Sequence, residues 1–372
     1  MNNYVKTYRS DIKRRKLPLW VKTIYVMTLI TAVLHAMTVF FEGFAEFVNK
    51  YISSPLRFAV VNLTDIIPFS LAELLVISLP VILIILISFA IKNYSDSGRS
   101  VMVFGGILLS VVMLFYILFF FMHGVGYNTK TLDKQLGLEK DTVDAEELYE
   151  TTILLADEAN RAAADISFRK RNFSYMPYSY DVLSDKLNND YADFSAKNDF
   201  IPSLRSQLKP VILSPLMSYT NVTGIYSYFT GETNINTDFP DYTVPFTAAH
   251  EMAHQRGIAR EDEANFIAFL VCKDSTDPYI KYSAYVNMLD YFLNALYGTD
   301  EELYKLALRS INGNIIYEFV SYGDFFEKYH DSEAGKITGV INDTYLKLNG
   351  TEGERSYGLV VDLTVAYYKA EK

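Results

Sequence analysis

Cysteine and histidine are scarce in this sequence, with one cysteine and five histidines among 372 residues. A single cysteine cannot form an intramolecular disulfide, so the core must hold the fold, and an oxidising compartment is permitted but not indicated. Cys272 lies in the apolar run NFIAFLVCK, which favours a small buried side chain over a nucleophile. The sequence contains no internal repeat and no low-complexity linker.

Charge is absent from three apolar runs in the first third of the chain, at residues 23–41, 74–91 and 100–122. Each run is long enough to cross a hydrocarbon core of roughly 30 Å as a helix. Helices buried in a soluble core rarely extend so far without a charge, so we expect three transmembrane helices within residues 1–122. The first run is long, precedes two further spans and is followed by bulky residues, which indicates a signal anchor and not a cleaved signal peptide.

Positive charges are concentrated before the first run. Residues 1–22 contain seven Lys and Arg and one Asp, whereas the loop after the first run contains only Lys50 and Arg57 beside several acids. This bias predicts a multi-pass membrane protein with its N-terminus in the cytoplasm. Three crossings then place residues 123–372 outside the cytoplasmic membrane.

Residues 123–372 have the length of one domain. Residues 1–122 contain 11 Lys plus Arg and 6 Asp plus Glu, which leaves 23 basic and 38 acidic residues for the remainder. An acidic domain of this kind argues against nucleic acid as a partner. The sequence does not decide the oligomeric state.

Most of this domain has the pattern of helices. Apolar residues at helical spacing predict helices in the segments 141–166, 179–197, 279–297, 301–312 and 355–370. Residues 209–239 are rich in β-branched and aromatic residues with Pro and Gly between them, which predicts two or three short strands. We therefore expect a mainly α (α+β) domain.

Two of the five histidines lie four residues apart in TAAHEMAHQRGIAREDEANFIA, residues 247–268. Pro245 suits the first turn of a helix, and Thr243 suits its N-cap. Gly257 suits the left-handed residue that ends this helix. His250 and His254 then share one helix face, and Glu251 lies beside it. This is the H-E-x-x-H arrangement of zinc metallopeptidases, in which the two imidazoles bind Zn²⁺ and the glutamate is the general base.

A third protein ligand is expected in the segment after Gly257. A second helix packed back against the first would bring Glu261 close to His254, because the two are nearly equidistant from the turn. Glu263 is rotated by about 200° around that helix and is the second choice. Arg260 stands where a third histidine would be needed in H-E-x-x-H-x-x-G-x-x-H, so that class is excluded.

HEMAH followed by EDEAN resembles the glutamate-zincin (gluzincin) class, whose second helix carries E-x-x-A-D or E-x-x-A-N. That resemblance implies Glu261 as the third ligand and Asn265 as a partner that orients a histidine. The wider layout resembles the bacterial domain-of-unknown-function 3810 family of membrane proteins. The stretches that carry this likeness are IPFSLAELL, GVGYN, KPVILSPLMSYTNVTGIY, FTGETNIN, PFTAAHEMAHQRGIAREDEANFIAFL and SYGLVVDL. This likeness implies a protein of the bacterial cytoplasmic membrane with three transmembrane helices and an extracytoplasmic, zincin-like domain.

The expected activity is hydrolysis of peptide bonds, in a peptide or protein outside the membrane, by a zinc-bound water that Glu251 activates. His330, Tyr226 and Tyr228 are candidates for stabilising the oxyanion. TGETNINTDF could be an edge strand that binds an extended substrate or, equally, a polar surface turn.

Two alternatives to this peptidase stay open. One is a receptor or assembly protein with a zincin fold that binds metal or peptide without turnover, although such a protein would not need Glu251. Another is a structural membrane protein with a chance motif. An intramembrane protease is disfavoured, because the motif is distant in sequence from every span and has charged neighbours.

Overall fold

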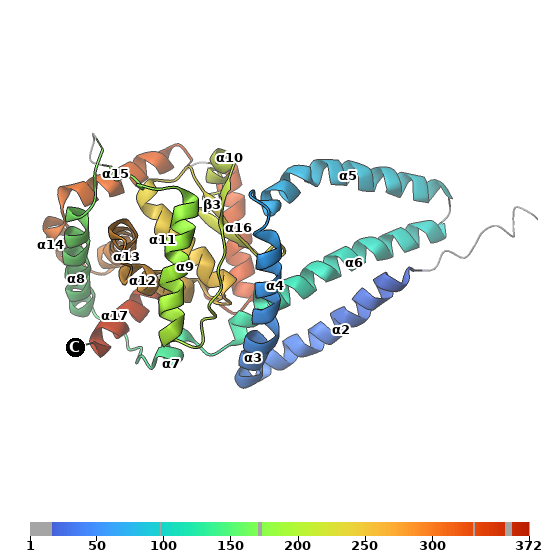
Figure 1. Cartoon of the computed structure of the whole chain (residues 1–372), viewed down its shortest axis with the longest axis horizontal. Coiled ribbons are helices and arrows are strands. Elements are labelled where there is room, and N and C mark those ends of the chain that lie inside the picture. Colours follow the sequence, from blue (N-terminus) through green and yellow to red (C-terminus); the bar gives the residue numbers. More distant parts are fainter. Residues whose placement is uncertain (1–16, 97, 170–172, 330–331, 354–358, 372) are drawn as a thin grey trace, which may run out of the picture.

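Three long apolar helices extend away from a mostly helical domain (Figure 1). The computed structural model describes residues 17–96, 98–169, 173–329, 332–353 and 359–371. The long helices are α2 (Leu19–Phe40), α5 (Leu71–Asp96) and α6 (Gly98–Met122). Their apolar windows are at most 11% buried, and each is long and apolar enough to cross a membrane. The prediction of three apolar N-terminal helices is confirmed, with limits that differ by a few residues.

The segment between α2 and α5 is helical and packs against the domain. It consists of α3 (Glu42–Val48), a π-helical turn η1 (Asn49–Ser53) and α4 (Ser54–Thr64). Arg57 of α4 is 1% exposed and donates hydrogen bonds to Asn49 Oδ1 (2.7 Å) and to the Phe121 carbonyl (3.4 Å). In the sequence this segment was identified only as a loop between apolar runs, so its helices and its packing were not predicted.

Five predicted helices of the domain are present as α8 (Ala145–Ala164), α9 (Tyr180–Lys197), α13 (Pro278–Thr299), α14 (Glu301–Ser310) and α17 (Val360–Ala370). At the start of α8, Asp144 and Glu147 form a capping box, in which each side chain accepts the other residue's backbone N–H. Four α-helices among the described residues of the domain were not predicted from the sequence, namely α7 (Leu132–Leu136), α10 (Ser214–Ser218), α15 (Gly313–Glu327) and α16 (Glu333–Leu348).

The core of the domain surrounds two helices that carry the motif, α11 (Val244–Gln255) and α12 (Glu261–Lys273). Residues 262–272 of α12 are all buried, and α13 packs against α8, α11 and α12. Cys272 is fully buried among these helices, as predicted. The motif therefore lies in the interior of the domain and not in a surface loop.

A small sheet covers one side of α11. Its strands are β1 (Leu208–Val211), β2 (Gly224–Ser227) and β3 (Glu232–Asn236), in the order β1-β3-β2, with β1 parallel and β2 antiparallel to β3. TGETNINTDF was a candidate edge strand, and this is wrong, because β3 lies in the middle and is buried throughout. The edge strand beside α11 is β2.

The sheet is hydrogen-bonded to the N-terminal end of α5. The Glu232 carboxylate accepts the backbone N–H groups of Leu71 and Ala72, both at 2.9 Å, and so caps this helix. In return, Glu73 of α5 accepts the N–H groups of Ile212 and Leu213. A carboxylate is favourable at a helix N-terminus, where the N–H groups lack partners in the helix. Helix α5 and the sheet are thus held together by charge-assisted hydrogen bonds.

Candidate metal centre

The turn after α11 brings two segments of the motif together. The helix begins with Thr243 as its N-cap and Pro245 in the first turn, although the Thr243 hydroxyl donates to the Pro240 carbonyl and not to the helix. At the other end, Gly257 has φ +102°. The N–H of Gly257 donates to the His254 carbonyl, and that of Ile258 to the Ala253 carbonyl, which is the Schellman pattern. Glycine is required here, since other residues rarely adopt this backbone conformation.

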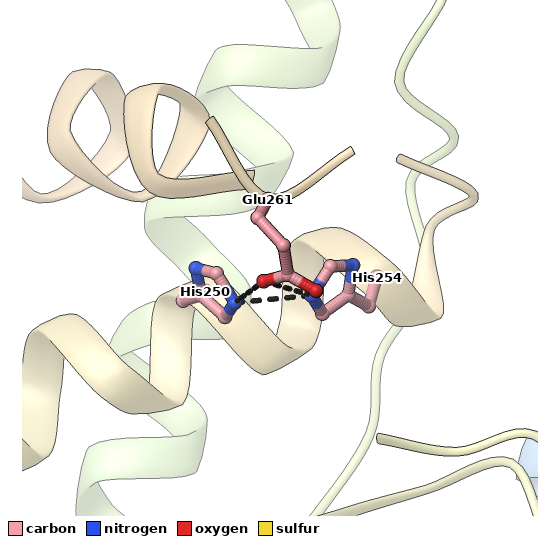
Figure 2. A group of neighbouring side chains, drawn as sticks. All are labelled: His250, His254 and Glu261. Atoms are coloured by element: carbon pink, nitrogen blue, oxygen red, sulfur yellow. Dashed lines mark hydrogen bonds and ion pairs between the residues drawn. The ribbon is translucent and has the colours of Figure 1, made fainter. Parts of the chain in front are cut away.

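His250 and His254 project from α11 toward Glu261, the first residue of α12 (Figure 2). The two histidine Nε2 atoms are 3.0 Å apart, and Glu261 Oε2 lies 3.2 Å from His250 Nε2 and 3.5 Å from His254 Nε2. Ligand atoms of a tetrahedral zinc site with bonds of about 2.0–2.1 Å lie about 3.3–3.4 Å apart. The three atoms therefore have the separations of one face of a zinc tetrahedron, which leaves a fourth position for another ligand.

The outer nitrogen of His254 has a fixed partner. His254 Nδ1 lies 2.7 Å from the Ile258 carbonyl oxygen, which can only accept, so Nδ1 carries a proton and Nε2 is the atom directed at the cluster. The Ile258 carbonyl thereby fixes the orientation of the His254 ring, as hydrogen-bond partners of the ligating histidines do in metal sites. Within the described residues, buried His250 Nδ1 and Asn265 Nδ2 have no hydrogen-bond partner. The orienting role of Asn265 stays a prediction.

The charges of the cluster are matched. Burial opposes ionisation of Glu261, but the His254 imidazole and hydrogen bonds from both histidines outweigh it and hold the Glu261 pKa well below its usual range. Burial likewise opposes charge on His254, yet the Glu261 carboxylate raises the His254 pKa to about 9. Without a metal ion, His254 and Glu261 therefore form a buried ion pair. A bound metal ion would replace the proton on His254 Nε2, because only the neutral imidazole and the ionised carboxylate are ligands.

Glu263 faces away from the histidines. Its Oε1 accepts the N–H of Leu132 at the start of α7 and a guanidinium N–H of Arg260, at 2.9 and 3.0 Å. Burial raises the Glu263 pKa to about 7. Arg260 also donates to the carbonyls of Tyr127 and Thr129. These two residues join α12 to the segment after α6, and of the two glutamates the structure brings Glu261 to the histidines.

Glu251 lies beneath the edge strand. It is 6% exposed, and burial raises the pKa of its carboxyl group although both histidines act in the opposite direction. The backbone N–H of Tyr226 in β2 bonds the carboxylate. A Cβ on Gly224 would stand 2.8 Å from Glu251 Cγ, so the strand approaches this closely only because residue 224 is glycine.

His123 is a further site residue that the sequence analysis missed. It follows α6 directly, is 7% exposed, and its ring centroid lies 5.3 Å from that of His254 in a T-shaped contact. Burial, with His254 adding to it, lowers the His123 pKa to about 3, so this imidazole is neutral. The only signals in the sequence were the scarcity of histidine and the adjacent GVGYN, which forms η2 (Gly124–Asn128).

The structure describes two of the three side chains that were candidates for stabilising the oxyanion. The Tyr226 hydroxyl donates to the Met122 carbonyl. Tyr228 packs its ring on Phe119, and His330 lies outside the described residues. Tyr345 of α16 was not foreseen. Burial raises the Tyr345 pKa, and Glu261 and Tyr228 are close enough to raise it further.

A family model described as "Protein of unknown function (DUF3810)" matches residues 44–365. The match begins in α3 and covers α5, α6, the sheet and all of the cluster. No curated protein and no solved structure matches the chain. The activity must therefore be inferred from the residues of the site.

Proposed function

The chain belongs to the DUF3810 family, and we propose that it is a membrane-anchored zinc metallopeptidase that cleaves peptide bonds outside the cytoplasmic membrane. One observation carries the proposal. The ligand atoms of His250, His254 and Glu261 lie within 4.8 Å of one another, and the acidic residue Glu251 is buried beside them. Three protein ligands with an open position are typical of catalytic zinc sites, whereas structural sites use four.

The orientation in the membrane is part of the proposal. It rests on the three apolar helices and on the basic residues before the first of them, and it places the N-terminus in the cytoplasm and the domain outside. The sheet and the cluster then lie on the outer side, next to the ends of α5 and α6 at which Leu71 and Met122 stand.

In the proposed mechanism, His250, His254 and Glu261 hold the zinc ion, and the Ile258 carbonyl fixes the ring of His254. Bound zinc supplies Lewis acidity toward water and toward the scissile carbonyl. Glu251 accepts the proton of the attacking water and passes it to the leaving amine, a role for which its raised pKa suits it. Tyr345 is a phenol close enough to Glu261 for the carboxylate to raise its pKa, and it is our candidate donor to the oxyanion.

The ligand arrangement also fits a protein that binds metal without turnover. Glu251 favours the enzyme, because a binding site has no use for a carboxylate buried under a strand where burial raises its pKa. A non-catalytic receptor becomes the conclusion if zinc binds and no peptide is cleaved.

The test is metal content and peptide cleavage by the full chain in detergent or nanodiscs. We expect one zinc per chain in the wild type, loss of zinc in Glu261→Gln, and retention in Glu263→Gln, the matched control two residues away. Glu251→Gln should keep zinc and lose cleavage of a mixed peptide library. A folded wild type that takes up no zinc would refute the proposal.

A further inference from the structure

The edge strand β2 connects the proposed catalytic residues to the membrane side of the domain. At one end, Gly224 lies against Glu251, and the N–H of Tyr226 bonds the same carboxylate. Along one edge β2 pairs with β3, and no strand of the described residues pairs with its other edge. Ile225 on this strand is 50% exposed. An extended polypeptide could add to this edge with its backbone beside Glu251.

The turn that follows β2 lies among the outer ends of the spans. The Phe229 ring packs edge-on against Phe115 of α6 (centroids 5.5 Å apart), and the Tyr228 ring packs against Phe119 (5.4 Å). Gly231 packs on Val60 and Val61 of α4. Immediately after it, Glu232 caps α5. The turn is therefore in contact with three helices that reach or adjoin the membrane.

Helix geometry gives the depth of this turn. Phe115 precedes Met122, the last residue of the third span, by seven positions, which corresponds to about 10 Å along the helix. Phe229 therefore lies at the level of the outer part of the span. The candidate metal centre lies at its end, because His123 follows Met122 and its ring contacts His254.

We propose that the substrates are membrane-anchored proteins, cut in the extended stretch directly outside their anchor. The proposal rests on the peptidase function proposed above. A chain on the edge of β2 runs between Glu251 and the level of the outer part of the third span, and at about 3.3 Å per residue a distance of roughly 10 Å requires only about three residues. A soluble peptide is not held at any fixed distance from the membrane. In a protein anchored in the same bilayer, the residues directly outside the anchor lie at the level of β2 and Glu251.

The first test measures where cleavage occurs. The zinc-loaded full chain is reconstituted in liposomes together with a mixed-sequence tether of about 40 residues fused to a single transmembrane anchor. The same tether without the anchor is added outside other liposomes, and Glu251→Gln serves as the inactive control. Fragments are identified by mass spectrometry, which gives the distance of each cut from the anchor.

We expect cuts within roughly the first ten residues outside the anchor, and at least tenfold slower cleavage of the free tether. Cuts spread evenly along the tether, or equal cleavage of the free peptide, would overturn the membrane-anchored substrate and leave the peptidase function intact. No cleavage of either by the zinc-loaded protein would overturn both proposals.

A second measurement does not depend on activity. Cys272 is the only cysteine and is buried, so single exposed cysteines can be labelled selectively. A nitroxide at Phe229→Cys should be accessible to oxygen and protected from a water-soluble nickel chelate in liposomes. The aqueous control is Leu306, which is 45% exposed and belongs to α14, a helix at the far side of the domain from the three long apolar helices (Figure 1). Equal nickel accessibility at both positions would show that the turn does not reach the membrane.

Discussion

Gly257 offers a sharp test of how the cluster is held, because it stands between His254 and Glu261. A Cβ at this position would lie 2.5 Å from Nη2 of the buried Arg57, in addition to the strain of φ +102°. Gly350 is a matched control, since it has φ +82° and open space around the same position. The two glycine-to-alanine variants therefore share the backbone strain and differ in the contact with Arg57.

The expected magnitudes follow from these two terms. A left-handed backbone costs a non-glycine residue about 1–2 kcal/mol, so Gly350→Ala should lower Tm by about 2–8 °C. An overpacked contact adds about 1–3 kcal/mol, so Gly257→Ala should lower Tm by about 4–20 °C. A shift of this turn also separates His254 from Glu261, and we expect zinc affinity to fall at least 10-fold in Gly257→Ala alone.

Thermal unfolding followed by circular dichroism, with zinc titration of the same samples, measures both effects. The double variant with Arg57→Met completes a mutant cycle. Because methionine removes the guanidinium that the new methyl group would meet, the two changes should couple by about 1–3 kcal/mol. Equal destabilisation by Gly257→Ala and Gly350→Ala, or additive effects in the cycle, would contradict the packing of Arg57 under this turn.

Three further predictions concern the strand, the span and the core. Gly224→Ala should displace Glu251, so we expect zinc to be retained and peptide cleavage to fall about 100-fold. Glu232→Ala removes the cap of α5 and should cost about 1–2 kcal/mol in thermal unfolding without changing zinc stoichiometry. Burial raises the Asp290 pKa to about 6, so the stability this group contributes is present below pH 4 and is lost as pH rises through 6. Asp290→Asn should therefore stabilise the protein at pH 7 by up to about 3 kcal/mol and not at pH 4, as Tm at both pH values will show.

Local geometry explains why part of the site could be read from the sequence. One helical turn separates His250 from His254, and a glycine turn followed by a second helix brings Glu261 back to them. Each step spans a few residues, so helix periodicity and turn chemistry are sufficient. The same reasoning separated Glu261 from Glu263, which lies on the opposite side of α12 and bonds Leu132 and Arg260.

The remaining parts of the site depend on contacts between distant segments. His123 precedes His254 by more than a hundred residues, and no periodicity relates them. Strand order is also non-local, which is why β3 was mistaken for a possible edge although β2 occupies it. Sequence distance was likewise a poor measure of how far the motif lies from the apolar helices, since His123 directly follows α6 and its ring contacts His254.

These long-range contacts predict that the domain cannot complete its site without the segment between the first two spans. Residues 42–70 supply the Arg57 guanidinium beneath the Gly257 turn and the Ile67 carbonyl that accepts from the buried Lys209 ammonium at 2.6 Å. A fragment of residues 123–372 loses both and exposes the apolar surfaces that they cover, so it should unfold at lower temperature and bind zinc more weakly than the full chain. The matched comparison is residues 42–372 exported behind a cleavable signal peptide, which lacks α2 alone and should bind one zinc with the affinity of the full chain. Equal zinc affinity and equal Tm of the fragment 123–372 would contradict this dependence, and the site would then be a property of the C-terminal domain by itself.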